Sequence, residues 1–159
     1  MWKDDIYSLT IKHDSEYMRH FYFYIYLKLK ELPRYCNGIN YNTSESWQAL
    51  AMIDTGASNS AASSRLIERI GLVSSGRSIY SHAMGEITTP LYKFDVMFPD
   101  NKEFENIGAV EFKAFDECDF LIGMNIFRQG DMAISSENGI MAFSFHTPTF
   151  NKYIDFEKI

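Results

Sequence analysis

Residues 49–58 read ALAMIDTGAS, an apolar run that passes into an Asp-Thr-Gly triplet. The apolar residues predict a buried strand, which would deliver the carboxylate of Asp54 into a tight turn. A catalytic carboxylate needs a rigid support of this kind. Gly56 tolerates unusual backbone torsions and lets another backbone come close, and Thr55 carries a short hydroxyl for hydrogen bonds. Asp54 is therefore a candidate catalytic residue.

The same triplet has a plainer interpretation, because Asp, Thr and Gly are all common turn residues. Taken alone, it fits a hairpin turn as well as a catalytic site. Its surroundings favour the site. An apolar strand precedes Asp54, the small residues Ala57 and Ser58 follow it, and a helix is predicted at residues 61–70, ending at Gly71.

Short strands dominate the rest of the chain. Aromatic and β-branched residues predict strands at residues 21–29, 47–53, 78–82, 87–98, 103–112, 119–122, 131–135 and 140–145. The last two flank Asn138-Gly139, the strongest hairpin signal in the chain. A brief helix is predicted at 125–129, and residues 1–19 fit a tail, a strand or a helix. Candidate caps for the longer helix are Ser58, Asn59 and Ser60. The pattern predicts one β-rich domain.

Composition excludes several classes of protein. A chain of 159 residues, 46% of them hydrophobic, has the size of one domain. Its formal net charge of −6, with no basic stripe, argues against nucleic acid as a partner. The most apolar run, residues 21–29, is too short to span a bilayer, so no membrane partner is expected. With no apolar signal segment and only two cysteines, Cys36 and Cys118, we expect a cytoplasmic protein.

Metal and cofactor signatures are missing from the sequence. The four histidines are scattered without the spacing of metal ligands. Neither a glycine-rich phosphate loop nor a Ser-His-Asp signature occurs. We therefore expect no metal and no cofactor.

The residues around the triplet resemble a known family. Residues 51–58, AMIDTGAS, are similar to the active-site signature of retropepsins, the aspartic proteases of retroviruses, and of their single-domain relatives in bacteria. Residues 119–126, DFLIGMNI, resemble the second hallmark of the family, which is two apolar residues and a Gly before a short helix. The resemblance extends over about residues 47–147. Further similarity to the bacterial relatives lies at residues 58–72, 130–134 and 143–145.

This resemblance implies a mostly β chain with the acid protease fold, a single-domain retropepsin-like closed β-barrel with a flap hairpin and one or two short helices. We expect residues 1–20 to be a polar N-terminal extension and residues 21–147 to be the retropepsin-like aspartic protease domain. Residues 148–159 would be a C-terminal tail and a candidate dimer interface. The aromatic run 21–26 fits a core strand packed on both faces, which we favour. It also fits part of that interface, because retropepsin dimers interleave their terminal strands.

Aspartic peptidases use two carboxylates that share one proton across a water molecule. This chain has one Asp-Thr-Gly triplet, so a homodimer with a two-fold axis through the site is expected to supply the second. The resemblance assigns catalytic positions to Asp54, Thr55 and Gly56, with Thr55 bonding across the axis. It assigns substrate-binding positions to Ala57, Ser58 and Asn59. Retroviral members often carry a second Asp where this chain has Ser58.

A flap that closes over the substrate is expected at residues 81–88. Its substrate-binding residues would be His82, Ala83, Met84, Gly85 and Glu86. Retroviral flaps are rich in glycine, whereas this segment has one glycine. An ordinary surface hairpin is therefore the alternative interpretation.

The expected activity is that of an aspartic endopeptidase, which hydrolyses a peptide or protein substrate with a water activated between two Asp54 carboxylates. The alternative is a catalytically inactive dimer of the same fold that binds peptides or serves as a scaffold, since a fold does not fix a function. The intact triplet favours the enzyme. The glycine-poor flap and Ser58 favour the alternative.

Overall fold

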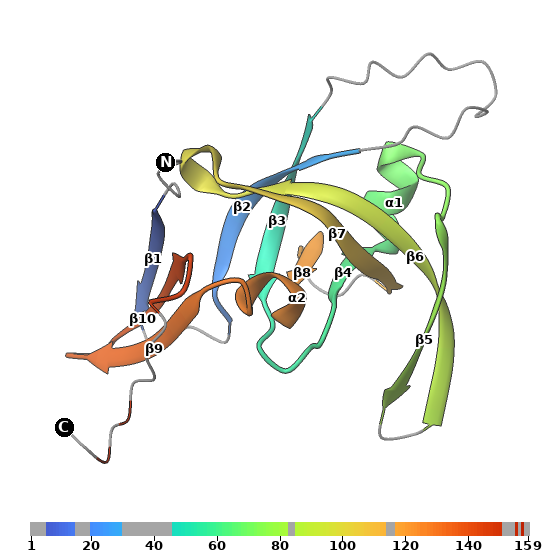
Figure 1. The fold of residues 1–159 in the computed structure, drawn as a ribbon. Helices are drawn as coiled ribbons and strands as arrows, with labels where there is room; N and C mark the ends of the chain where they lie inside the picture. Colours follow the sequence, from blue (N-terminus) through green and yellow to red (C-terminus); the bar gives the residue numbers. More distant parts are fainter. Residues whose placement is uncertain are drawn as a thin grey trace. The chain divides into compact units, whose positions relative to one another are not determined.

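The computed structural model describes residues 6–14, 20–29, 46–82, 85–113, 117–150, 155 and 157. Most of these residues lie in short strands, with two short α-helices and one 3-10 turn between them (Figure 1). The chain forms two compact units: residues 20–126 make the larger one, and residues 1–19 with 127–159 make the smaller one. No helix among the described residues is long and apolar enough to cross a membrane.

The larger unit is built on one sheet of seven strands. In spatial order these are β2 (Tyr22–Lys28), β3 (Ser46–Ile53), β8 (Phe120–Ile122), β4 (Ser60–Ser63), β7 (Glu103–Phe112), β6 (Gly85–Met97) and β5 (Gly76–His82). Neighbours are antiparallel except in the pairs β3–β8 and β4–β7, which are parallel. β2 also pairs with β6, from Tyr26 opposite Met97 to Lys28 opposite Asp95, so the sheet bends back on itself. Full closure into a barrel stays a prediction.

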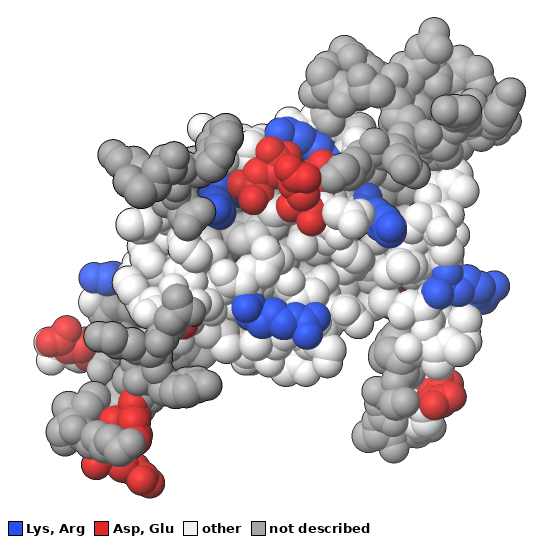
Figure 2. Space-filling model, in the orientation of Figure 1, with Lys and Arg blue, Asp and Glu red and all other residues white. Residues whose placement is uncertain are grey.

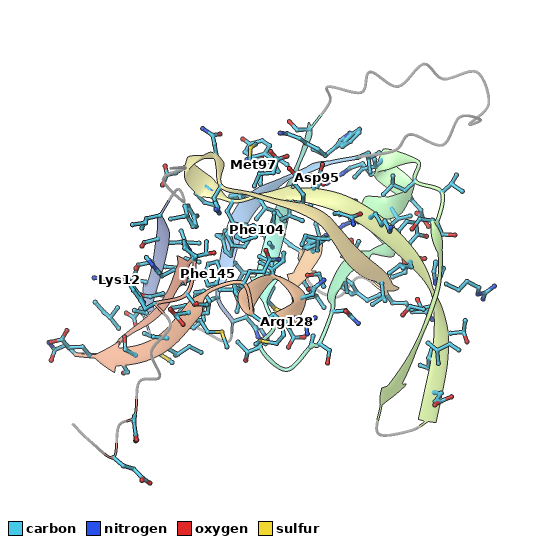
Figure 3. All side chains as sticks on the ribbon, in the orientation of Figure 1. Lys12, Asp95, Met97, Phe104, Arg128 and Phe145 are labelled. Carbon is cyan, nitrogen blue, oxygen red and sulfur yellow. The ribbon has the colours of Figure 1, made fainter. Side chains whose placement is uncertain are left out.

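Aromatic and branched side chains fill the core of this sheet. Alternate residues of a strand share a face, so Ile25 and Leu27 of β2 are both fully buried. Phe94 on β6 meets Phe120 on β8 edge to face, with ring centroids 5.7 Å apart. Phe104 on β7 is buried in the same interior (Figure 3). Burial of each such side chain stabilises the fold by about 1.5–3 kcal/mol.

The strand predicted at residues 21–29 is present as β2, but it is not packed on both faces. Its outward-facing Tyr24 and Tyr26 are 59% and 41% exposed. The expectation of a core strand with two buried faces is therefore wrong for this chain, because the opposite face of β2 meets solvent.

The helix predicted at residues 61–70 begins later than expected. Residues 60–63 form strand β4, and only Ser64–Ile70 is helical (α1). The four small residues of β4 are all buried between β8 and β7, and this place in the sheet overrides their helix propensity. Ser63 caps the helix, and Gly71 ends it with φ of 71°, as predicted. The caps predicted at Ser58, Asn59 and Ser60 are wrong.

The smaller unit is a three-stranded antiparallel sheet. Its strands are β1 (Tyr7–Asp14), β10 (Ile140–Thr147) and β9 (Asp131–Glu137), with β10 in the middle. Asn138 and Gly139, with φ of 50° and 76°, form the predicted tight turn between β9 and β10. The undecided N-terminal segment therefore contains a strand.

The two faces of the smaller sheet differ in polarity. Phe143 and Phe145 of β10 are buried against Phe127, with ring centroids 5.3 and 5.4 Å apart. On the other face, Thr10 of β1 and Ser144 of β10 share a hydrogen bond of 3.0 Å. An antiparallel sheet with one apolar and one polar face is suited to burying a single side.

Gly123 lies between β8 and helix α2 (Met124–Phe127), where two segments of backbone come very close. A Cβ atom added to Gly123 would lie 2.4 Å from both the carbonyl carbon and the oxygen of Asn59, and 2.8 Å from the nitrogen of Ser60. Backbone atoms cannot move aside as a flexible side chain can. Glycine is therefore required here by space rather than by torsion angles.

Gly123→Ala should lower the free energy of unfolding by about 3 kcal/mol, because the added methyl group forces β8 away from the neighbouring backbone. Gly76→Ala is the matched control, since no atom lies within 4 Å of its added Cβ. Chemical denaturation followed by circular dichroism measures both values. Equal stability of the two variants would contradict the close approach at Gly123.

Candidate active site

Asp54 follows β3 directly and stands in a tight turn. Its backbone N–H donates to the carbonyl of Ile122 on β8 at 3.0 Å, so the pairing of the strands extends to this residue. Gly56 N–H donates to Asp54 Oδ1 at 3.0 Å, and Ala57 N–H donates to the Asp54 carbonyl at 3.3 Å. The Asp54 side chain is half-buried. The turn therefore presents a carboxylate that is oriented by the backbone and still reaches solvent.

The loop after the triplet is fastened to the segment that follows β8. Met124 N–H donates to the Ala57 carbonyl at 2.8 Å. Asn125 Oδ1 accepts from the N–H and the Oγ of Ser60, at 2.9 and 2.7 Å. Ser60 Oγ in turn accepts from Gly123 N–H at 3.1 Å. The two motifs that resemble retropepsins are thus bonded into one structure.

The sequence does not identify Ser60 and Asn125 as partners at the site. It predicts Ser60 as a helix cap, and it places Asn125 in the second hallmark and at the start of a brief helix. The available signal is that Asn125 is polar within the apolar run around residues 121–127. Its partner lies 65 residues away in the chain, and a pairing at that distance cannot be inferred from one sequence.

The remaining predicted residues around the triplet form the outer side of the turn. Thr55, Gly56, Ser58 and Asn59 are exposed, and Ala57 is half-buried. Their hydroxyl, amide and backbone groups are accessible to an extended peptide or to another subunit. The structure thus brings residues 54–59 together on one accessible surface.

β5 and β6 form the hairpin in which the flap is predicted. His82 pairs with Gly85 at its outer end. The hairpin extends past the sheet on the same side as the loop 54–59 (Figure 1). Gly85 and Glu86 are exposed, whereas Ala83, Met84 and the side chain of His82 lie outside the described residues.

Two titratable groups of the larger unit have raised pKa values. Burial raises the pKa of the Cys118 thiol, so it stays protonated and is a poor nucleophile at neutral pH. Burial, together with a hydrogen bond to Glu111, raises the pKa of Tyr92 to about 12. Cys118 is packed in an apolar cluster with Met52, Ala61 and Leu121. Both groups are thus held in their neutral forms and act as packing residues.

Basic side chains of the described residues are not gathered in one patch on the face shown in Figure 2. There, Lys and Arg lie in small separate groups and form no continuous basic surface. Among the described residues, no three His, Cys, Asp or Glu side chains are placed to hold a metal ion together. The chemistry that the described residues offer at loop 54–59 is that of a carboxylate that accepts a hydrogen bond from the backbone N–H of Gly56.

Comparison with known proteins places this geometry in a family. The family described as "gag-polyprotein putative aspartyl protease" matches residues 45–129, just over half of the chain. No curated protein sequence matches. The chain is similar to the crystal structure of a retropepsin-like aspartic protease from Rickettsia conorii, with a TM-score of 0.56 and 19% identity. That match covers 92% of this chain and 98% of the other, and at this identity it shows the fold alone.

The matched segment contains the Asp54 turn, all of the larger sheet from β3 to β8, and the Gly123 contact. Both hallmarks therefore lie within the matched segment, in the order that the resemblance implies. The chain belongs to the gag-polyprotein aspartyl protease family, with a retropepsin-like fold.

Proposed function

We propose that the chain is an aspartic endopeptidase that acts as a homodimer on a peptide or protein substrate. Membership of the family supports an aspartic-type hydrolase. The observation that carries the proposal is the half-buried Asp54 carboxylate at the end of β3, with Gly56 N–H donating to its Oδ1 at 3.0 Å. One chain supplies one such triplet, so a second copy related by a two-fold axis completes the pair.

In the proposed reaction a water molecule lies between the two Asp54 carboxyl groups, one of which is protonated. The ionised carboxylate takes a proton from the water, whose oxygen forms a bond to the carbonyl carbon of the substrate. The protonated carboxyl group gives its proton to the carbonyl oxygen. The carboxyl group that took the proton of the water then gives it to the amide nitrogen, and the other carboxylate takes a proton from a hydroxyl of the tetrahedral diol. The C–N bond breaks, a carboxylic acid and an amine leave, and the pair again holds one proton.

The neighbouring residues have supporting roles in this proposal. Thr55 hydrogen-bonds across the two-fold axis and stiffens the pair, while Gly56 lets the substrate backbone approach. The cleft is lined by Ala57, Ser58 and Asn59. The hairpin of β5 and β6 closes as a lid, which excludes water. Its substrate contacts come from His82, Ala83, Met84, Gly85 and Glu86.

The smaller sheet offers a surface for the second copy. Within the described residues, β9 pairs only with β10. Met132 and Ile134 of β9 lie opposite Phe145 and Phe143, which are buried, yet they are 38% and 53% exposed. A strand edge with exposed apolar side chains favours pairing with another chain. We therefore assign the dimer contact to the β9 edge. The tail at 148–159, also a candidate interface, lies largely outside the described residues.

A non-catalytic dimer that binds peptides or serves as a scaffold is the second candidate function. Ser58 stands where retroviral members often have a second Asp, and residues 81–88 contain one glycine. Both features weaken the expected hold on a substrate backbone. The cytoplasm is the expected location for either function, because two cysteines are too few for a disulfide framework.

Asp54→Asn should reduce cleavage of an unstructured protein substrate by at least about 100-fold, because an amide cannot take or share the proton. The wild-type rate should be higher below neutral pH than above it, since ionisation of both carboxyl groups removes the shared proton. Mass spectrometry of the fragments measures both effects. Cleavage by both proteins would identify a contaminating protease. A dimeric wild-type protein that cleaves nothing would favour the non-catalytic function.

Ile134→Lys should convert the dimer into monomers and lower the cleavage rate in proportion, because a lysine at the β9 edge opposes strand pairing. Val73→Lys is the matched control: Val73 is 56% exposed and lies outside both sheets. Analytical ultracentrifugation at several concentrations gives the dimer fraction. A dimer equally stable in both variants would show that the contact lies elsewhere.

A further inference from the structure

Asp119 is a buried carboxylate with no part in the proposed reaction. It is 8% exposed and comes immediately before β8. Its backbone N–H donates to the Leu50 carbonyl at 2.9 Å, and its Oδ2 accepts from the Leu50 N–H at 3.2 Å. Its carbonyl accepts from Ser63 N–H at 2.9 Å. One residue thus binds β3 on one side and the end of β4 on the other.

Two arginines of α1 hold this carboxylate. Arg65 Nη2 lies 3.2 Å from Asp119 Oδ1 and also donates to the Glu117 carbonyl at 2.9 Å. Arg69 Nη2 lies 3.7 Å from Asp119 Oδ2 and donates to the carbonyl of Gln48, on β3, at 3.2 Å. The helix is thereby fastened to the starting parts of both β3 and β8. We call Asp119, Arg65 and Arg69 the α1 clamp.

The unequal burial of the residues of the α1 clamp favours a role in positioning strands over a role in stabilising the fold. The Asp119 side chain is 11% exposed, whereas each arginine side chain is 48% exposed. Removing a carboxylate from water costs free energy that an ion pair only partly offsets, and exposed partners are screened by solvent. An apolar residue at 119 would avoid this cost but could not accept the Leu50 N–H bond. The clamp therefore specifies the placement of β3 and β8 more than it strengthens the fold.

Asp54 stands at the other end of the same pair of strands. β3 and β8 are parallel, so their starting ends lie together and their finishing ends lie together. Three residue pairs, from Ala51 opposite Phe120 to Ile53 opposite Ile122, separate the clamp from the site. The next hydrogen bond is the one from Asp54 N–H to the Ile122 carbonyl. The clamp fixes one end of a short ladder, and the candidate catalytic group is at its other end.

We propose that Asp119 is a positioning residue for Asp54, which acts by fixing the register and the tilt of β3 on β8. This inference rests on the proposed function, because it concerns the distance between the Asp54 carboxyl groups of two subunits. Because a two-fold axis relates the two subunits, a displacement of β3 moves both Asp54 carboxyl groups. A displacement of about 1 Å in a reacting group lowers a rate by about 100-fold.

Asp119→Asn is the central test, with Asp95→Asn as the matched control. Asn has the size of Asp but lacks the charge that holds the two arginines. Asp95 Oδ1 also accepts a backbone N–H, that of Asn106 at 2.7 Å, and it lies on β6 at the side of the molecule away from loop 54–59 (Figure 3). Each substitution thus replaces a carboxylate that accepts a backbone N–H with a neutral amide. Asp119→Asn changes a residue of the α1 clamp, whereas Asp95→Asn does not.

The expected result for Asp119→Asn is a kcat lower by at least about 10-fold with KM within about twofold of wild type. The alkaline limb of the pH profile should move to lower pH, because carboxyl groups that are farther apart hold the shared proton less strongly. Amide hydrogen exchange of residues 49–56 should be faster. Asp95→Asn should leave all three unchanged. A purely structural role would lower the active fraction without moving the pH profile, and that result would overturn the proposal.

Hydrogen exchange separates this proposal from the proposed function. If the wild-type protein has no peptidase activity but Asp119→Asn exchanges faster at residues 49–56, the enzyme proposal fails and the clamp stands. If residues 49–56 of Asp119→Asn exchange at the wild-type rate, the proposed positioning role of Asp119 is wrong, whether or not the protein is a peptidase. Should Asp119→Asn not fold, Arg65→Gln takes its place, because that side chain is half-exposed and the same three measurements apply.

Discussion

The parallel pairing of β3 with β8 is the contact on which the larger unit depends. It carries Asp54 at its end through the bond to Ile122, and the following Gly123 lets the loop backbone pass at contact distance. Parallel strands cannot be joined by a tight turn. The chain therefore places β4, α1 and the strands β5 to β7 in the connection between them, and the four strands of this connection join the same sheet.

Hydrogen bonds from backbone N–H groups define most of the shape of the Asp54 turn. The donors are the N–H groups of Asp54, Gly56, Ala57 and Met124, and the side chains of Ser60 and Asn125 bond to each other behind the turn. Backbone bonds do not depend on the identity of exposed side chains. Within one chain, the exposed side chains of Ser58 and Asn59 can therefore change with little effect on the position of the carboxylate.

Local features of the fold are predictable from the sequence, whereas features made by distant contacts are not. The Asn138-Gly139 turn, the end of α1 at Gly71 and the turn at Asp54 each depend on a few neighbouring residues, and the sequence identifies all three. The sequence predicts helix for most of β4, because Ala and Ser have little preference for strands. Its place between β8 and β7 makes this segment a strand. The pairing of Arg65 with Asp119 spans 54 residues and leaves no local pattern. For residues 1–19 the sequence leaves a tail, a strand or a helix open, and the pairing of Tyr7–Asp14 with β10 makes this segment a strand.

The smaller sheet joins strands from the two ends of the chain, with Ser8 bonded to His146 across 138 residues. During synthesis the larger unit, residues 20–126, leaves the ribosome before residues 131–147, which form β9 and β10. Domains generally fold as units while the chain emerges. The turn at Asp54 can thus form while residues 131–147 are still inside the ribosome, before β9 and β10 pair with each other and with β1.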